Sequence, residues 1–294
     1  MDTPELCYAG RAELAEGPVW HEGALWWVNI VSGTLNRLDV STGLNTARAT
    51  GDFLSSAVPK GDGGWLVARR GECALLDWKS GKLTPFAKPA EMPSGNRFND
   101  GKCDPAGRYW VGSMDLKLRP RRAALYRVDH DGRVERMIEN LSLSNGVAWS
   151  AAGDRFFHVD TTERRLTAYD FDLARGTLSN ARLIREFAES EGSPDGMAID
   201  REDKLWIALW GGSAVVQVDP RSGKTLSRHE LPVAQVSACA FGGEDSSTLF
   251  ITTAWQNLSL ERRIAQPLAG SIFALKTQTR GAPVSLFGPT GADR

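Results

Sequence analysis

Short runs of apolar, aromatic and β-branched residues alternate with turn-forming residues along the whole chain, and this pattern predicts strands. The clearest predicted strands are residues 24–30, 64–68, 124–128, 166–171 and 214–218. Asp, Gly and Pro gather between such runs, for example at residues 39–43 and 219–223, as expected of tight turns. Helical periodicity is not convincing over any long window. The chain is therefore predicted to be all-β.

A polar residue followed by a small one recurs at the start of each copy of a long repeat. The pairs are Glu16-Gly17, Ser56-Ala57, Asp100-Gly101, Asn145-Gly146, Asp195-Gly196 and Ser237-Ala238, at intervals of 40, 44, 45, 50 and 42 residues. Repeats of this length, made of short strands and Gly turns, are typical of β-propellers. Six copies predict a six-bladed β-propeller.

The repeat spans nearly the whole chain, and no Gly/Ser-rich or Pro-rich linker divides it. We therefore expect a single domain over residues 1–294. Closure of the ring should borrow a strand from the N-terminal part of the chain, expected around residues 9–14. A ring closed in this way leaves only short, protected strand edges.

Closure about one axis should bring the six polar positions together in a central channel. Four of them, Glu16, Asp100, Asn145 and Asp195, carry carboxylate or amide oxygens, and buried charge is costly unless it is paired or bound to an ion. These oxygens suit Ca²⁺, Mg²⁺ or Mn²⁺, while Fe²⁺ or Zn²⁺ would need fewer ligands and bound water. Asp or Asn before Gly also suits a tight turn, so a single pair is weak evidence. Four such pairs at the same position of the repeat favour a central-channel metal site.

Three further side chains lie near these positions or in predicted strands. Arg97 and Asn99 precede Asp100, and a cation and an amide at the mouth of a metal channel could bind the hydroxyls or carbonyl of a small polar ligand. The alternative for Arg97 is a surface residue in an ordinary salt bridge. His158 lies in a predicted strand and is interpreted as a satisfied strand histidine rather than a catalytic base.

Composition narrows the classes of function. The net charge is −1, from 35 basic and 36 acidic residues, and without a basic run nucleic acid is not an expected partner. The four cysteines have no metal-binding spacing, and neither a phosphate loop nor a GxSxG motif is present. The N-terminal residues lack the features of a signal peptide, and no apolar run approaches the ~20 residues that span a membrane. We expect a cytoplasmic protein without membrane partners, as a monomer or weak dimer.

The motifs at residues 16–20, 97–102, 104–108, 144–146, 194–196 and 205–208 resemble, in order and spacing, those of the senescence marker protein/regucalcin/gluconolactonase family. The resemblance extends over essentially the whole chain. It implies a six-bladed propeller that hydrolyses aldonolactones with one divalent metal ion, Ca²⁺, Zn²⁺, Mn²⁺ or Fe²⁺.

By the same resemblance, Glu16, Asn145 and Asp195 match metal ligands, and Asp195 also matches the residue that accepts and donates the proton. Arg97 and Asn99 match substrate-contacting positions. Asp100 is grouped with the substrate-binding residues in the channel. The repeat favours it as a direct metal ligand, whereas the family pattern places it beside the ligands.

The chain departs from the family at one position. In the vertebrate members, an acidic residue on the loop after a Gly-Ser/Thr-Met segment contacts the substrate. The corresponding place here falls near Lys117. A basic residue would read sugar hydroxyls differently, which argues against gluconolactone itself and towards the bacterial relatives that act on pentonolactones.

The predicted function is therefore metal-dependent hydrolysis of a sugar lactone, with Asp195 as general base and acid. Whether Asp195 or the metal ionises the attacking water stays open at this point. One alternative is a calcium-binding regulatory propeller without catalytic activity, because a fold alone does not fix function. Another is a metal-dependent hydrolase of a non-sugar ester or phosphotriester.

Overall fold

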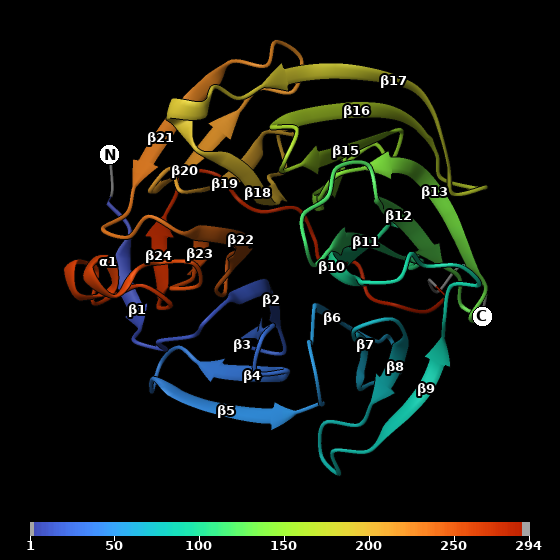
Figure 1. Cartoon of the computed structure of the whole chain (residues 1–294), viewed down its shortest axis with the longest axis horizontal. Coiled ribbons are helices and arrows are strands. Elements are labelled where there is room, and N and C mark those ends of the chain that lie inside the picture. Colours follow the sequence, from blue (N-terminus) through green and yellow to red (C-terminus); the bar gives the residue numbers. More distant parts are fainter. Residues whose placement is uncertain (1–2, 290–294) are drawn as a thin grey trace.

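The fold is a ring of six four-stranded sheets around one axis (Figure 1). The computed structural model describes residues 3–289. Met1, Asp2 and residues 290–294, which the expected domain of residues 1–294 includes, lie outside the described residues. The predicted all-β, six-bladed propeller is confirmed. No helix among the described residues is long and apolar enough to cross a bilayer.

Each blade runs from an inner strand at the axis to an outer strand at the rim. Blade 1 has β2 (Ala15–His21), β3 (Ala24–Asn29), β4 (Thr34–Asp39) and β5 (Leu44–Ala49). Blade 2 has β6 (Ser56–Pro59), β7 (Trp65–Ala68), β8 (Cys73–Leu76) and β9 (Leu83–Ala87). Blade 3 has β10 (Asn96–Cys103), β11 (Tyr109–Asp115), β12 (Ala123–Val128) and β13 (Val134–Leu141).

The second half of the ring repeats this order. Blade 4 has β14 (Ser144–Trp149), β15 (Arg155–Asp160), β16 (Arg165–Asp172) and β17 (Thr177–Glu186). Blade 5 has β18 (Ser193–Ile199), β19 (Leu205–Trp210), β20 (Ala214–Val218) and β21 (Thr225–Glu230). Blade 6 has β22 (Val236–Gly242), β23 (Thr248–Thr253), β24 (Ile272–Lys276) and β1 (Glu5–Tyr8). A short 3-10 helix (Glu189–Glu191) and helix α1 (Leu260–Ala265) lie in connecting loops.

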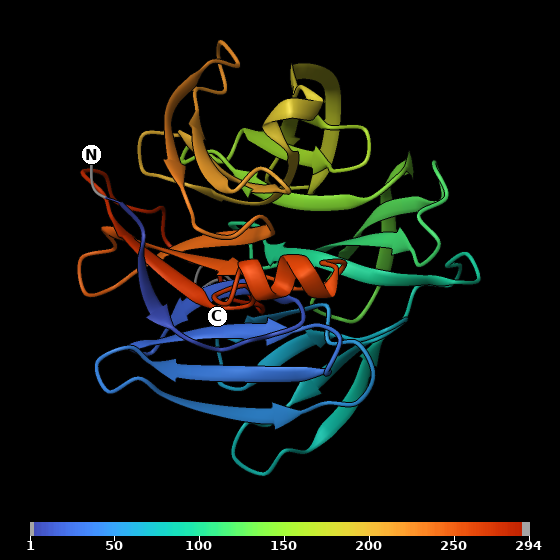
Figure 2. The same cartoon turned by 60° about the vertical axis from the view of Figure 1, so that its left-hand side comes forward.

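An N-terminal strand closes the ring, as predicted, but the expected residues 9–14 are wrong. The closing strand is β1, which pairs antiparallel with β24 in blade 6 (Figure 2). Residues 9–14 instead carry the chain from blade 6 to blade 1. Arg11 has φ +46° there, a left-handed conformation that interrupts a strand, and the Ala12 amide donates to the Gly270 carbonyl at 2.8 Å.

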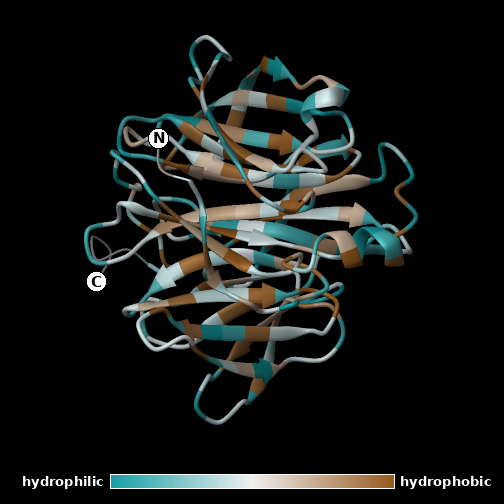
Figure 3. Ribbon diagram, turned by 90° about the vertical axis from the view of Figure 1, so that its left-hand side faces the viewer, coloured by the Kyte–Doolittle hydropathy of each residue, from teal (hydrophilic) through white to brown (hydrophobic). Residues whose placement is uncertain are grey.

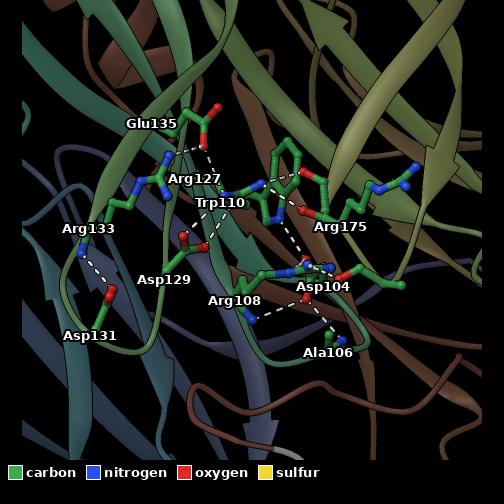
Figure 4. Close-up of polar contacts among 12 residues, drawn as sticks. Asp104, Ala106, Arg108, Trp110, Arg127, Asp129, Asp131, Arg133, Glu135 and Arg175 are labelled. Atoms are coloured by element: carbon green, nitrogen blue, oxygen red, sulfur yellow. Dashed lines mark hydrogen bonds and ion pairs between the residues drawn. The ribbon is translucent and has the colours of Figure 1, made fainter.

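The turn between β10 and β11 of blade 3 is built around a buried aspartate and is hydrogen-bonded to blade 4 (Figure 4). Asp104 accepts hydrogen bonds from the amides of Ala106 (2.9 Å) and Arg108 (3.0 Å) and from Trp110 Nε1 (2.9 Å). Arg108 Nε donates to the same carboxylate at 2.7 Å, and its Nη2 reaches the Leu173 carbonyl at 2.7 Å. One carboxylate thus fixes a turn, a core indole and an inter-blade bond.

Blade 5 repeats this turn. Asp200 accepts from the amides of Glu202 (3.0 Å) and Lys204 (2.9 Å) and from Trp206 Nε1 (3.0 Å). In both blades the tryptophan follows the aspartate by six residues. The turn therefore satisfies the one polar atom of an indole that would otherwise be buried without a partner.

The apolar core lies between adjacent blades, so that each sheet is covered on both faces, and polar residues are concentrated in the turns (Figure 3). Trp110, which is fully buried, packs on Phe156 of blade 4 with 5.4 Å between ring centroids, and on Trp149. This is the inter-blade packing that the strand tryptophans predict. The result is a stiff ring that holds the starts of its inner strands in fixed positions.

We predict that Asp104→Ala lowers the free energy of unfolding by about 3–5 kcal/mol, because it leaves the Arg108 guanidinium without its buried partner. Asp131→Ala is the control, since Asp131 lies on an exposed turn of the same blade and, within residues 3–289, accepts only the Arg133 amide, at 3.0 Å. It should change stability by less than about 0.5 kcal/mol. Urea denaturation of both variants measures the difference, and equal losses would contradict the prediction.

Candidate functional site

The inner strands β2, β6, β10, β14, β18 and β22 line the axis (Figure 1), and the six repeated polar residues lie on them. Glu16, Asp100, Asn145 and Asp195 are only 4–6% exposed. The structure therefore gathers the four oxygen-bearing residues in a buried axial set, which we call the axial polar set.

The two serines of the repeat have another role. Ser56 Oγ donates to the Asn99 carbonyl at 3.1 Å, and Ser237 Oγ donates to the Ala15 carbonyl at 2.6 Å. Both hydroxyls are fully buried. They join one inner strand to the next and leave the four other positions to face the axis.

Asn145 has a buried oxygen without a partner. Its Nδ2 donates to Asp195 Oδ1 and, at 3.2 Å, to Thr161 Oγ1. Its Oδ1 is buried and accepts no hydrogen bond from residues 3–289. Buried acceptors are rarely left unsatisfied, so this atom points to a missing group that accepts electron pairs. A metal cation is such a group.

The carboxyl groups of the axial polar set disfavour one another's ionisation. Burial, and next the charge of Asp100, raise the pKa of Glu16 to about 8, although the Gly17 amide, Arg97 and Lys102 oppose the shift. The pKa of Asp195 is raised well above its usual range by burial and then by Glu16 and Asp100. Burial also raises the pKa of Asp100. A divalent cation would favour the ionised forms of all three.

These residues fit a metal ion only as a mixed set. Among residues 3–289, no three His, Cys, Asp or Glu side chains cluster closely enough to hold one. The set that fits combines the carboxylates of Glu16 and Asp195 with the unpartnered amide oxygen of Asn145. Such all-oxygen ligands are typical of hard cations such as Ca²⁺.

Arg97 and Asn99 lie next to the axial polar set. Arg97 is only 5% exposed, and its Nη1 donates to Asn99 Oδ1 and the Phe98 carbonyl, each at 2.8 Å. Asn99 Nδ2 donates to the Ser144 carbonyl at 3.0 Å, which fixes the pair against β14. The alternative of a surface salt bridge is wrong, because Arg97 is buried and forms no direct ion pair with the described carboxylates.

The charge of Arg97 is maintained by the axial polar set. Burial lowers the pKa of Arg97 to about 10, while Glu16 and then Asp195 oppose this shift. The guanidinium therefore stays protonated at neutral pH. Its Nε and Nη2 make no hydrogen bond within the described chain, so these groups can donate to a ligand at this end of the channel.

Sequence reasoning missed Lys102, which the repeat could have revealed. It occupies the position two residues after the repeated polar residue, where the other five blades have Pro18, Val58, Val147, Met197 and Cys239. Lys102 Nζ donates to the Met197 carbonyl, and its charge helps to lower the pKa values of Glu16 and Asp100. It is a second cation beside the axial polar set.

His158 is a satisfied strand residue, as predicted. Its Nε2 and Ser144 Oγ are 2.9 Å apart, and burial lowers its pKa to about 3. The imidazole is therefore neutral at physiological pH and is held inside blade 4.

Lys117 lies on the same side of the ring as Arg97. In the β10–β11 pair Asn96 is opposite Asp115, and the Leu116 amide donates to the Gly95 carbonyl at 3.0 Å. The loop that follows β11 therefore returns to the end at which β10 begins. Lys117 is exposed on this loop, and no ion pair involves it among the described residues.

Fold and site together define a class: a six-bladed propeller with a buried axial set of carboxylate and amide oxygens and an arginine beside it. Residues 14–255 match the family model described as "SMP-30/Gluconolactonase/LRE-like region". The chain belongs to this family, which confirms the resemblance seen in the motifs.

Several relatives align over almost their full length. The Bacillus subtilis protein named "Putative sugar lactone lactonase YvrE" is 34% identical over 281 residues, which cover 95% of this chain and 96% of the relative. Regucalcin of Danio rerio is 37% identical over 267 residues, 90% of each chain. The solved structure of a calcium-binding protein, regucalcin, from Agrobacterium tumefaciens has a TM-score of 0.93 and 29% identity, and covers 98% of both chains.

The raised carboxyl pKa values predict that metal-free protein loses stability between pH 6.5 and 8. Folded Glu16 keeps a proton up to about pH 8 that the unfolded chain has already released, so its stabilising contribution falls as the pH rises. The pKa of His158 is shifted in the opposite direction, but its contribution to stability no longer changes above about pH 6.5. We expect a loss of about 1–2 kcal/mol across this window.

Urea denaturation in chelator, repeated with saturating Ca²⁺, measures this effect. Ca²⁺ should stabilise more as the pH rises, because it binds the ionised carboxylates. Glu16→Gln is the control and should flatten the metal-free profile. A wild-type stability that stays constant from pH 6.5 to 8 would contradict the prediction.

Proposed function

We propose that this protein hydrolyses a sugar lactone in a reaction that depends on a divalent metal ion. The substrate would be an aldono-1,4- or 1,5-lactone, such as a pentono- or gluconolactone, and the product the open-chain aldonic acid. The observation that carries the proposal is the buried Arg97–Asn99 pair beside the axial polar set. The membership of the gluconolactonase-like family and the lactonase name of a relative support it.

Glu16, Asn145 and Asp195 would hold the metal ion. When bound, the cation would polarise the lactone carbonyl and offset the charge that develops on its oxygen. Asp100 would lie beside these ligands, since it raises the pKa of Glu16 without completing a cluster of three acidic ligands. Arg97 and Asn99 would bind ring hydroxyls and orient the carbonyl carbon towards the attacking water.

Asp195 would move the proton. As water attacks the carbonyl carbon, Asp195 accepts a proton from it, and the bond between that carbon and the ring oxygen breaks. Asp195 then returns the proton to the ring oxygen, and the aldonic acid ionises and releases one proton to the solution. Burial and the neighbouring acids raise the pKa of Asp195, and an ionised carboxylate with a raised pKa is a stronger base.

The alternative functions differ in what they need from Arg97 and Asn99. A calcium-binding regulatory propeller would need the axial oxygens alone, and the Agrobacterium relative is described as calcium-binding. An ion site gains nothing from a buried guanidinium, which repels a cation, whereas a substrate site gains two hydrogen-bond donors. A hydrolase of a non-sugar ester or phosphotriester would use the same groups and differ only in substrate.

A lactone panel tests the proposal. Metal-stripped protein is assayed by proton release against pentono- and hexonolactones, with Ca²⁺, Mn²⁺, Zn²⁺ and Fe²⁺ added in turn and spontaneous opening subtracted. We expect acceleration only with metal. No acceleration with any of the four metals, in protein shown by calorimetry to bind one, would leave the regulatory or non-sugar alternatives.

Asp195→Asn should lower kcat by at least about 10³-fold, a loss in the range contributed by general acid–base catalysis. Asp172→Asn, on the outer part of blade 4, is the control and should retain the wild-type rate. Circular dichroism and thermal unfolding establish that both variants are folded. Substantial turnover in folded, metal-loaded Asp195→Asn would disprove the role of Asp195.

Lys117→Glu should change the order of preference within the lactone panel, because it reverses a charge on the loop beside Arg97. Lys224→Glu makes the same charge change on the exposed turn between β20 and β21, at the opposite end of the ring, and should leave the order unchanged. Ratios of kcat/KM for each lactone are the measurement. An identical profile for wild type and Lys117→Glu would show that this loop does not read the sugar.

A further inference from the structure

A second cavity lies on the axis, beyond the axial polar set. It has a volume of about 320 Å³. Its walls come from the later residues of the inner strands, among them Val19, Val58, Ala148, Ala198, Ala240 and Phe241. Glu16, Arg97, Asn99, Asn145 and Asp195 do not line it.

The order of residues along β10 separates this cavity from the candidate active site. Arg97 and Asn99 come before Asp100, whereas residues 100–103 line the cavity. The same holds in the other blades, where the lining residues follow the repeated polar position. The cavity and the Arg97–Asn99 pair therefore lie on opposite sides of the axial polar set.

Small apolar side chains create the space. Ala148, Ala198 and Ala240 each follow the repeated polar residue of their blade by three positions, and Val19 does so in blade 1. An apolar cavity of about 150 Å³ is enough to hold benzene, and typical small-molecule sites begin at about 300 Å³. This cavity is therefore large enough for a bicyclic molecule.

A segment near the C-terminus, which we call the strap (residues 281–288), crosses the far end of the channel (Figure 1). The Ala282 amide donates to Ile199 of blade 5 at 3.1 Å, and the Phe287 amide to Pro59 of blade 2 at 2.8 Å. Phe287 is 4% exposed, and its ring meets Phe86 edge-on with 5.5 Å between centroids. Residues 282–285 line the cavity between these anchors. The strap therefore covers part of the cavity at this end of the channel.

The cavity has two charged groups in its wall, Asp100 and Lys102. Asp100 Oδ1 accepts from the Gly101 amide at 2.8 Å, and its Oδ2 accepts no hydrogen bond from residues 3–289. Lys102 already donates to the Met197 carbonyl. Apart from Asp100, Lys102, Ser150 and Ser285, the lining residues are apolar or glycine, so burial of an ionic ligand there is costly.

We propose that this cavity is a second binding site, for a compact, uncharged and largely apolar molecule with one hydrogen-bond donor. Its apolar body would lie against Val19, Ala148, Ala240 and Phe241, and its donor would face the free oxygen of Asp100. The site needs no metal ion and no lactone, so its test is independent of the proposed function.

Fluorescence titration of metal-free, full-length protein with 2-naphthol tests the site, with 2-naphthoate as the anionic counterpart. We expect one saturable equivalent of 2-naphthol and an affinity for 2-naphthoate that is at least about tenfold lower, since burial of a carboxylate among mostly apolar side chains is costly. Absence of saturable 2-naphthol binding overturns the proposal, as does equal or tighter binding of 2-naphthoate.

Two substitutions test whether 2-naphthol binds in this cavity. Ala240→Leu fills the cavity and should weaken 2-naphthol binding at least tenfold, whereas Ala47→Leu adds the same methyl groups on the exposed outer strand β5 and should have no effect. Ser285→Trp blocks the cavity from the strap without touching a blade, and should weaken binding even if Ala240→Leu fails to fold. Binding that survives Ser285→Trp, or that is lost in Arg97→Ala instead, places the probe elsewhere and overturns the proposal.

Discussion

The close approach of the six inner strands at the axis is the constraint on which the rest of the structure depends. It explains the glycine that follows the repeated polar residue in blades 4 and 5. A Cβ atom on Gly146 would lie 2.6 Å from the Asp195 carbonyl oxygen, and one on Gly196 would overlap Ala238 of the next blade. At these two positions the small residue leaves room for the next inner strand, and the polar residue before it faces the axis, so this part of the sequence repeat follows from ring closure.

The close approach of the inner strands also gathers ionisable side chains at the axis, where they are buried from water. Glu16, Asp100 and Asp195 approach one another at the axis with Arg97 and Lys102 as the nearby cations, and all three carboxyl pKa values are raised. A protein selected for stability alone would place apolar residues here. The inter-blade core and the buried aspartate turns supply the stability that lets the ring keep an unfavourable set of side chains at its centre.

Much of this fold could be predicted because one geometric requirement is repeated six times. The axial position of Glu16, Asn145 and Asp195 follows from the repeat alone. The closing strand was misplaced because Arg11 adopts a left-handed conformation that residue type does not reveal. Lys102 stands out when the repeats are aligned with Pro18, Val58 and their counterparts, but its contact with the Met197 carbonyl of blade 5 is not encoded in a local motif. The burial of Arg97 depends on packing between blades, which a local motif does not encode.

Asp100 is part of the axial polar set and also lines the cavity at the far end of the channel. From one side its charge is a main cause of the raised pKa of Glu16, and from the other its carboxylate lies in the wall of the second cavity. A ligand that hydrogen-bonds to Asp100 from the far side, as we propose, would change the potential at Glu16, and through it the affinity of the axial oxygens for the proposed cation. Linkage requires the reverse effect to be equal in free energy. If both proposed sites are occupied, the axial polar set would couple them electrostatically, without any movement of the blades.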